Sequence, residues 1–450
     1  MKSYGALFGQ VTDFGNLLHA AKRAARGKRQ RRDVYEYMAE LEGNLLELQR
    51  ELEDGLWAPG PYRDFTVRDP KTRLVSAAPF PDRVVHHAVC QVIEPLWERR
   101  FIDDTFACRL RKGAHRAADR YTEFCRGAAY VLKCDISRYF EHIRHDVLLS
   151  ELGHLIRDRR LLELLAQIVN SNDRRGGEAG RGIPIGNLTS QFFANVYLDR
   201  FDHWVKEELR CRRYIRYVDD FVLLHDDKQQ LWNWLEMIEA RLGAIGLTVH
   251  PRKRTVTPVT DGCDFMGFRI WPDHRRLRPT AGYRSRRKLV RAARLAGAGR
   301  LPPERLRASV WSWLGHVRHG DTCGLRRQML TQVRANCGTG PLGQTAFCAA
   351  VAGTTTTTTT AQPTATTTTR TTRTTTTGSV LPASLPGPGL ASRVPRRAGG
   401  ARPDYRPVPV LRTPPETNTQ EAAPGVVPEH REAPGPPAVQ NGGDAKSLRR

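Results

Sequence analysis

A strand–turn–strand pattern at residues 214–225 constrains the fold more than any other part of this sequence. β-Branched and aromatic residues flank the pair Asp219-Asp220, which predicts a hairpin whose two-residue turn is the pair of acids. A third acid, Asp135, ends an apolar strand that begins at Val131 and then turns toward a helix. An acidic pair between apolar runs is by itself most often a solvated turn. The third carboxylate makes a shared acidic site the better interpretation.

Three carboxylates delivered by two strands predict a site for two divalent cations. Mg²⁺ prefers oxygen ligands and usually binds one or two carboxylates together with the phosphates of a substrate. A metal pair roughly 3.5–4 Å apart can activate a 3′-hydroxyl and stabilise a departing pyrophosphate. Burying three acids without cations would be costly. The pattern therefore predicts nucleotidyl transfer with two Mg²⁺ ions, and with Mn²⁺ as the alternative ion.

The charge of the chain indicates a polyanionic partner. Its 450 residues carry a formal net charge of +24, and the pI is near 10.2, which favours nucleic acid. Nine cysteines include no C-x-x-C pair, so the spacing fits neither a zinc site nor a disulfide framework. No run of about 18 apolar residues and no signal-peptide pattern occurs, so we expect a cytoplasmic protein without a membrane partner.

Composition and periodicity divide the chain into four parts. Residues 1–60 predict a basic helical segment, and residues 61–271 mix strands and helices as an α+β domain. Residues 272–335 contain 16 Arg or Lys against 3 Asp or Glu, a net of +13, and predict a small basic helical domain that follows a phosphate backbone. Residues 340–450, with 18 threonines in the 24 positions 354–377, predict a disordered low-complexity tail.

Hydrophobic spacing locates the elements between these boundaries. We expect a two-stranded hairpin over 61–80 and a strand that ends at Lys253. Apolar residues at helical spacing predict helices at about 33–54, 82–97, 146–156, 160–170, 192–209 and 228–245. The pair His86-His87 has no third ligand nearby, so packed or surface histidines are the better interpretation.

Six segments resemble, in the correct order, the successive motifs of reverse transcriptases; they are 61–95, 131–147, 182–200, 214–225, 246–254 and 263–270. The sequence is identified most specifically with bacterial reverse transcriptases of the diversity-generating retroelement type. Ile185-Gly186-Asn187-Leu188-Thr189-Ser190-Gln191 resembles the signature of that group, and Ser312–His316 with Gly324–Arg327 resembles its thumb. The resemblance implies a right-hand polymerase fold, with fingers and palm over 61–271, a helical thumb over 272–335 and an antiparallel sheet in the palm.

The resemblance also implies roles for individual residues. The catalytic residues are Asp135, Asp219, Asp220 and Lys253, and Lys253 acts as the general acid that protonates pyrophosphate. The metal ligands are Asp135, Ile136, Asp219 and Asp220. Phe140 screens the nucleotide 2′-hydroxyl, which favours deoxynucleotides. The incoming dNTP is bound by Lys71, Arg73, Phe140, Ile185 and Gly186, and the primer grip is formed by Phe265, Met266, Gly267 and Phe268.

One departure from the retroviral and group II intron enzymes predicts relaxed fidelity. Those enzymes usually have Gln-Gly where this chain has Ile185-Gly186, and Ser-Pro where it has Ser190-Gln191. The glutamine contacts the incoming nucleotide through hydrogen bonds. A missing hydrogen bond changes selectivity more than a missing methylene does, so isoleucine removes polar discrimination. In the retroelement family such errors fall at template adenines and diversify a target gene.

The implied partners are a template RNA, a cDNA or primer strand, dNTPs and a small basic accessory protein. A first alternative is a group II intron-like or antiviral-defence bacterial reverse transcriptase. The Ser190-Gln191 ending, and the lack of any maturase, endonuclease or RNase H pattern, speak against the intron version. A second alternative, a non-catalytic RNA-binding protein, is disfavoured by the intact acids and Lys253. A third, an RNA-dependent RNA polymerase, is disfavoured by Phe140.

Overall fold

The computed structural model describes residues 3–68, 72–171 and 178–340, with a few residues between 344 and 350. All of these belong to one unit, Met1–Thr360. Lys71 and nearly all of the tail predicted at 340–450 lie outside the described residues. Among the helices of the described part, none combines the length and the apolar composition needed to cross a bilayer.

The N-terminal part consists of helices packed around one long helix. Asp13 precedes α2, and its carboxylate accepts a hydrogen bond of 2.9 Å from the Asn16 N–H. The single helix predicted at 33–54 is two helices, because the backbone of Glu40 leaves the helical region (φ −113°, ψ 39°). The elements are α1 (Phe8–Thr12), α2 (Phe14–Ala24), α3 (Arg32–Ala39), α4 (Leu41–Glu53) and the long α5 (Phe80–Glu98), against which α2 packs.

A hairpin and a group of helices follow. Strands β1 (Arg63–Arg68) and β2 (Thr72–Ala77) form the predicted antiparallel pair. In α9, the buried residues Leu161, Leu164, Leu165 and Ile168 recur at helical spacing and fix its inner face. The helix predicted at 192–209 is broken at Leu198 (φ −100°, ψ 7°). The helices are α6 (Ala114–Cys125), which was not predicted, α7 (Tyr139–His142), α8 (His145–Leu155), α9 (Arg159–Asn170), α10 (Leu188–Tyr197), α11 (Asp199–Glu207) and α12 (Lys228–Ala244).

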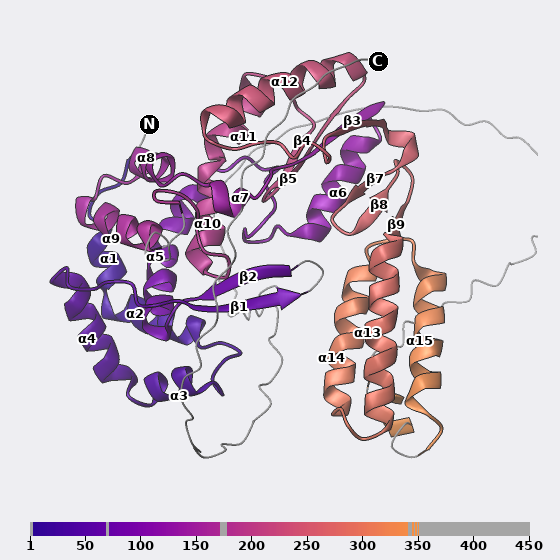
Figure 1. Ribbon diagram of the computed structural model, residues 1–450, viewed down its shortest axis with the longest axis horizontal. Helices are drawn as coiled ribbons and strands as arrows, with labels where there is room; N and C mark the ends of the chain where they lie inside the picture. The colour runs from indigo at the N-terminus through magenta and orange to yellow at the C-terminus, as the bar shows by residue number, and fades with distance from the viewer. Residues whose placement is uncertain are drawn as a thin grey trace, which may run out of the picture. The chain divides into compact units, whose positions relative to one another are not determined.

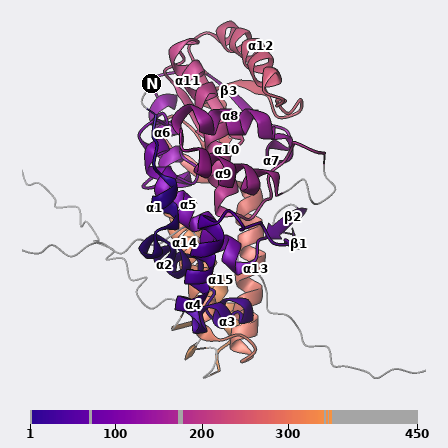
Figure 2. The ribbon, with the colours of Figure 1, turned by 90° about the vertical axis from the view of Figure 1, so that its left-hand side faces the viewer.

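A four-stranded antiparallel sheet, called the central sheet below, has the strand order β4-β5-β3-β6. Its strands are β3 (Tyr130–Asp135), β4 (Tyr214–Tyr217), β5 (Asp220–His225) and β6 (Thr255–Pro258). Because side chains alternate along a strand, the two faces of the sheet pack against two different cores. Leu132 and Leu223 join the larger core of helices, whereas Val131 and Val222 join a second core with α6. Helix α12 lies against this sheet (Figure 1, Figure 2).

A small sheet leads from the central sheet to a three-helix bundle. The sheet contains β7 (Cys263–Phe265), β8 (Phe268–Ile270) and β9 (Arg275–Leu277), all antiparallel. The bundle contains α13 (Pro279–Gly297), α14 (Pro303–Val317) and α15 (Cys323–Cys337), which lie in or just beyond the segment 272–335 that the sequence predicts to be basic and helical. Leu289, Val310, Leu314 and Val333 lie in the second core, so this core continues from the central sheet into the bundle.

The bundle depends on a close approach at Gly297. A Cβ atom added there would lie 2.0 Å from the carbonyl oxygen of Cys337, the last residue of α15. We therefore expect Gly297→Ala to lower the free energy of unfolding by about 1–3 kcal/mol, the usual cost of overpacking. Gly315→Ala is the control, since nothing lies within 4 Å of its new methyl group and alanine favours the helix by about 0.5–1 kcal/mol. Urea unfolding compares the two, and equal shifts would contradict the close approach.

Candidate active site on the central sheet

The pairing of β3 with β5 places two of the predicted acids opposite each other. Asp135 and Asp220 are Cα partners in the antiparallel register. Directly opposed residues have Cβ atoms about 4.5–5.5 Å apart, so the two carboxyl groups share one small region. Val131 and Lys133 precede Asp135 at intervals of two, and therefore face the same side of the sheet.

The third acid lies in the turn between β4 and β5, and this turn differs from the predicted one. Tyr217 pairs with Asp220, so the turn residues are Val218 and Asp219, and Asp220 already belongs to β5. Val218 has a left-handed backbone (φ +57°), which is rare for a β-branched residue. The carbonyl of Asp219 accepts a hydrogen bond of 2.9 Å from the Ile136 N–H. This bond ties the turn to the end of β3, beside Asp135.

The electrostatics of the three acids reflect their closeness. Burial raises the pKa of Asp219, and the charge of Asp135 raises it further against the opposing charges of Arg73 and Lys253. Burial raises the pKa of Asp220 to about 6; Lys133 opposes this shift, and both other acids and a hydrogen bond with Asp135 add to it. The fold therefore brings the three carboxyl groups together against their own repulsion.

Lys253 contacts the same group of acids. Its Nζ lies 2.6 Å from Oδ1 of Asp135, and its side chain is 38% exposed. The predicted strand ending at Lys253 is not formed; the residue lies in a turn, where its N–H donates to the carbonyl of His250. The His250 N–H in turn donates to the Asp135 carbonyl over 2.8 Å. Backbone and side chain thus both connect this turn to Asp135.

The residues predicted to bind the nucleotide come from β2, α7 and the loop before α10. The carbonyl of Ile185 accepts a hydrogen bond of 2.8 Å from the Ser76 N–H on β2, the strand that carries Arg73. A Cβ at Gly186 would lie 2.8 Å from the Val75 side chain, so only glycine fits this close approach. Half-buried Phe140 is connected to the same loop, since its carbonyl accepts from the Ile183 N–H.

The predicted primer grip is the turn between β7 and β8. Phe265 and Phe268 are 1% and 0% exposed, and they lie in the second core. Met266 and Gly267 form the turn between them, both with positive φ (48° and 87°). The structure therefore makes the turn itself, rather than the two aromatic rings, available for contact with a ligand.

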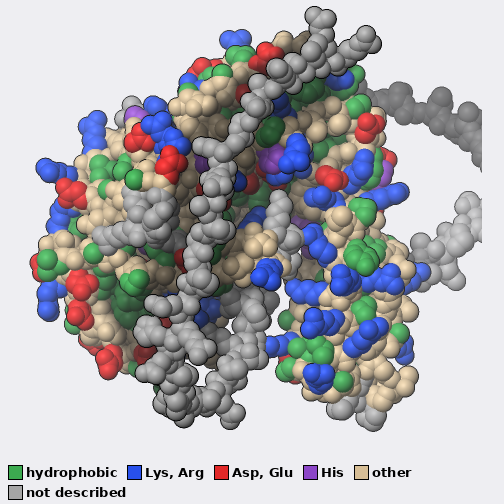
Figure 3. Space-filling view, in the orientation of Figure 1, with side chains coloured by type: hydrophobic (Ala, Val, Ile, Leu, Met, Phe, Trp, Pro, Cys, Tyr) green, Lys and Arg blue, Asp and Glu red, His purple; other side chains and the backbone are tan. Residues whose placement is uncertain are grey.

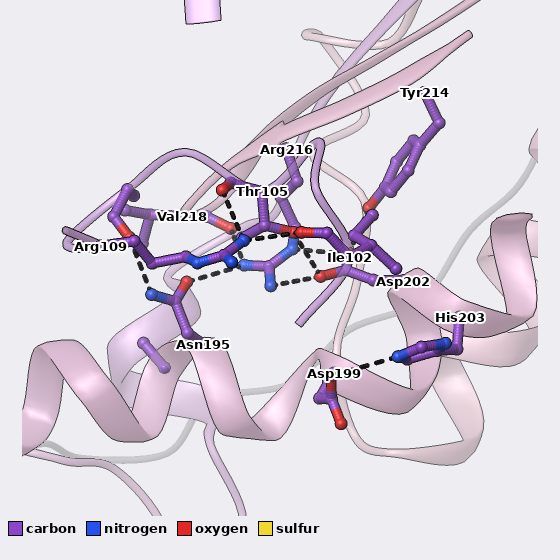
Figure 4. Close-up of polar contacts among 12 residues, drawn as sticks. Ile102, Thr105, Arg109, Asn195, Asp199, Asp202, His203, Tyr214, Arg216 and Val218 are labelled. Atoms are coloured by element: carbon purple, nitrogen blue, oxygen red, sulfur yellow. Dashed lines mark hydrogen bonds and ion pairs between the residues drawn. The ribbon is translucent and has the colours of Figure 1, made fainter. Parts of the chain in front are cut away.

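Two residues near the acids were not singled out from the sequence. Lys133 donates from Nζ to the Asp264 carbonyl on β7, and its charge counteracts the raised pKa of Asp220. Its position two residues before Asp135 is a signal that could have identified it. Arg216 on β4 is fully buried and forms an ion pair with Asp202 of α11 (Figure 4). No local pattern in the sequence reveals that pair.

The chemistry of the three acids suits divalent cations. Ionised carboxylates only accept hydrogen bonds. Burial and the charges of the neighbouring acids raise the pKa values of Asp219 and Asp220, and a bound cation would offset this unfavourable concentration of negative charge. The residues that would hold the ions are Asp135, Asp219 and Asp220, with Ile136 adjacent. Within the described ranges, no group of three or more His, Cys, Asp or Glu side chains is already arranged around a single metal position. One Asp135 oxygen is instead taken by Lys253.

Comparison with known proteins identifies the domain that contains these acids. Residues 67–270 match the model of the family described as reverse transcriptase (RNA-dependent DNA polymerase). They include β2 and all four strands of the central sheet. The chain contains a reverse transcriptase domain.

Known relatives of this reverse transcriptase domain occur in bacteria and in group II introns. Protein YkfC of Escherichia coli K12 is 26% identical over 267 residues, which cover 50% of this chain and 70% of that protein. Group II intron-encoded protein LtrA of Lactococcus lactis is 23% identical over 226 residues, 48% of this chain and 38% of LtrA. Apo telomerase from Candida tropicalis superposes with a TM-score of 0.42 at 11% identity, over 66% of this chain and 59% of telomerase, a similarity too low to add to the assignment.

These comparisons bear on the predictions made from the sequence. The predicted enzyme class, an RNA-directed DNA polymerase, is that of the family which residues 67–270 match, and the predicted mixed helix-and-sheet fold with an antiparallel sheet is confirmed. The predicted relation to bacterial proteins is supported by the similarity to YkfC and to group II intron-encoded protein LtrA.

Removing one of the three repelling charges tests the electrostatics of the site without any activity measurement. The folded chain binds the Asp220 proton more tightly than the unfolded chain does, so the ionised carboxyl destabilises the fold as the pH rises through about 6. We expect Asp220→Asn to raise the free energy of unfolding in EDTA at pH 7.5 by on the order of 1 kcal/mol, and to lose this gain below pH 4.

Urea unfolding at the two pH values measures this difference. Glu236→Gln on α12 is the control, since it removes one exposed carboxylate outside the site and should change neither value. Added Mg²⁺ should stabilise the wild type more than Asp220→Asn, because a ligand of the folded state shifts the unfolding equilibrium. An Asp220→Asn gain that is the same at both pH values would contradict the proposed repulsion.

Proposed function

We propose that this protein copies a template RNA into cDNA by two-metal nucleotidyl transfer at Asp135, Asp219 and Asp220. The observation that carries the proposal is the register of the central sheet, in which Asp135 faces Asp220 and the Asp219 carbonyl is bonded to Ile136. This arrangement brings the three carboxyl groups to the same end of the two inner strands of the sheet. It does so in the domain that matches the reverse transcriptase family.

The residues around the acids divide the chemical tasks. Divalent cations held by the three carboxylates would favour the ionised 3′-hydroxyl and offset the charge on the departing pyrophosphate. Lys253, 2.6 Å from Asp135, is the proton donor to that pyrophosphate in this proposal. Arg73, whose charge reaches Asp219, is the triphosphate contact in this proposal, together with Lys71, which lies outside the described residues. The half-buried ring of Phe140 is the surface that would exclude a 2′-hydroxyl.

The α13–α15 bundle is the proposed thumb, and it supplies the charge to hold a template–primer duplex. Figure 3 shows Lys and Arg side chains gathered over this bundle. Arg284, Arg287 and Arg291 belong to α13, where the buried side chains are the apolar Leu289, Ala293 and Ala296. A basic helical surface in the same compact unit as the acids favours contact with phosphates, which is independent of base sequence.

Primer extension tests this function. We expect the full-length protein to lengthen a DNA primer on an RNA template with dNTPs and Mg²⁺, and to use rNTPs poorly. Asp219→Asn should lower the rate by on the order of 1,000-fold, because several kcal/mol of charge stabilisation is lost. Glu236→Gln is the matched control for loss of one negative charge and should leave the rate unchanged. Equal rates for Asp219→Asn and the wild type would refute the assignment of the site.

The more specific proposal is an error-prone enzyme of the diversity-generating retroelement type, assisted by a small basic accessory protein. It is supported by the segment Ile185–Gln191, in which isoleucine stands where related enzymes have a hydrogen-bonding glutamine. In this proposal the half-buried Ile185 side chain forms an apolar wall of the dNTP site, since its backbone is bonded to β2, the strand that carries Arg73. An apolar side chain at this position forms no hydrogen bond with the incoming nucleotide, so it cannot discriminate among bases by polar contacts.

Replacing this isoleucine tests the link to fidelity. We expect Ile185→Gln to lower misincorporation opposite template adenine by roughly tenfold, since a polar contact restores discrimination that an apolar wall lacks. Sequencing of cDNA made in vitro by each variant gives the error frequency at every template base. Ile185→Leu keeps an apolar side chain of similar size and is the control. An unchanged adenine error rate in Ile185→Gln would remove the physical basis for relaxed fidelity.

A group II intron-like reverse transcriptase is the second candidate. Similarity to LtrA and to nuclear intron maturase 1 of Arabidopsis thaliana, 28% identical over 96 residues, favours it. The two candidates share the same chemistry and differ in the RNA that is copied. A gene pair of near-repeats that differ mainly at adenines beside this gene supports the retroelement type, whereas an enclosing intron RNA supports the second candidate.

A further inference from the structure

The turn that carries Asp219 rests on a buried ion pair. Arg216 of β4 and Asp202 of α11 have side chains that are 0% and 1% exposed. The guanidinium donates from Nε to Oδ1 over 2.7 Å and from Nη2 to Oδ2 over 2.6 Å. Asp202 also accepts from the hydroxyl groups of Tyr214 (2.7 Å) and Thr105 (2.9 Å), so the buried carboxylate is fully hydrogen-bonded (Figure 4). Both charges are therefore satisfied inside the core.

The third nitrogen of this guanidinium points at the turn. Nη1 donates to the carbonyl of Val218 over 3.1 Å and to Oδ1 of Asn195 over 3.4 Å (Figure 4). Asn195 is itself fixed, because its Nδ2 donates to the Ala107 carbonyl over 2.8 Å. Val218 is the residue immediately before Asp219, and its backbone is left-handed. A β-branched residue keeps such a conformation only where its surroundings determine it.

The backbone around the turn is held from two sides. On one side Arg216 binds the Val218 carbonyl, and on the other the Ile136 N–H binds the Asp219 carbonyl. The peptide units before and after Asp219 are thereby both fixed in orientation. The direction in which the Asp219 carboxyl projects toward Asp135 follows from that orientation.

We propose that Arg216 is a positioning residue for nucleotidyl transfer. Its guanidinium is anchored by Asp202, binds the Val218 carbonyl and thereby sets the position of the Asp219 carboxylate. This inference rests on the proposed function of the three acids. Stability alone does not explain the pair, since buried ion pairs can often be replaced by apolar residues with no loss of stability. What apolar residues cannot supply is a hydrogen bond to one particular carbonyl.

The variant Arg216→Lys separates the two roles. Lysine keeps the positive charge for Asp202, but one ammonium group cannot span both carboxylate oxygens and the Val218 carbonyl. We expect kcat for dNTP addition to fall about 10- to 100-fold, because a small displacement of a reacting group costs a rate factor of that order. KM for dNTP and the affinity for primer–template should stay within about threefold.

Arg100→Lys is the matched control. Arg100 is bonded to Asp199 on the same helix α11, and the two side chains are 19% and 2% exposed. The partner of Arg100 in this pair is Asp199, whereas the Val218 carbonyl in the turn is bonded by Arg216. We expect its kcat to stay within about threefold of the wild type. A kcat for Arg216→Lys as high as that of Arg100→Lys would overturn the proposal.

Amide hydrogen exchange supplies a readout that needs no activity. The Ile136 N–H, bonded to the Asp219 carbonyl, should exchange about tenfold faster in Arg216→Lys, whereas amides inside the β3–β5 ladder keep their wild-type protection. If the wild-type protein fails to extend a primer, the proposed function falls and this measurement still tests the positioning. Unchanged Ile136 protection, or an equal loss of protection throughout the sheet, would overturn it.

A double variant covers the case in which Arg216→Lys does not fold. Arg216→Met combined with Asp202→Leu removes both buried charges and leaves no unpaired one. We expect this protein to fold and to show the same 10- to 100-fold loss of kcat, since the bond to the Val218 carbonyl is still missing. Full kcat in the double variant, or a double variant that does not fold either, would assign the pair to stability alone.

Discussion

The antiparallel pairing of β3 with β5 is the constraint on which the rest of the site depends. It makes Asp135 the partner of Asp220, and a shift of the register by one residue would turn one of them to the opposite face. The register is determined by the two cores, because Leu132 and Leu223 must face one of them and Val131 and Val222 the other. Hydrophobic packing on both faces of the sheet thus fixes the position of two mutually repelling charges.

The sequence predicted the residues of the site better than the contacts that hold these residues in place. The strand ending at Asp135 and the β4–β5 hairpin follow from runs of apolar, β-branched and aromatic residues, which are a local signal. The turn was predicted one residue too late, at Asp219-Asp220. Valine disfavours the left-handed conformation that Val218 adopts, so local preference pointed to the two acids. Contacts with Arg216 and Ile136, which come from other parts of the chain, override this preference.

The predictions of helix boundaries were wrong for a related reason. Neither Glu40 nor Leu198 is a glycine or proline, so nothing in the local sequence interrupts the helices predicted across them. Helix α6 was missed because its buried face consists mainly of small residues, among them Ala117, Ala118 and Cys125, which give a weak periodic signal. In these cases tertiary packing, and not propensity, decides where the helix begins or ends.

A polar anchor suits a site made of repelling charges better than an apolar one. Apolar contacts are non-directional, so a turn held by them could relax away from the repulsion among Asp135, Asp219 and Asp220. A guanidinium offers five donors in a fixed plane, enough to grip both oxygens of Asp202 and still bind the Val218 carbonyl. Burial strengthens each of these bonds by lowering the local dielectric. Such bonds oppose displacement in a defined direction, which is what holding the Asp219 carboxyl near its neighbours requires.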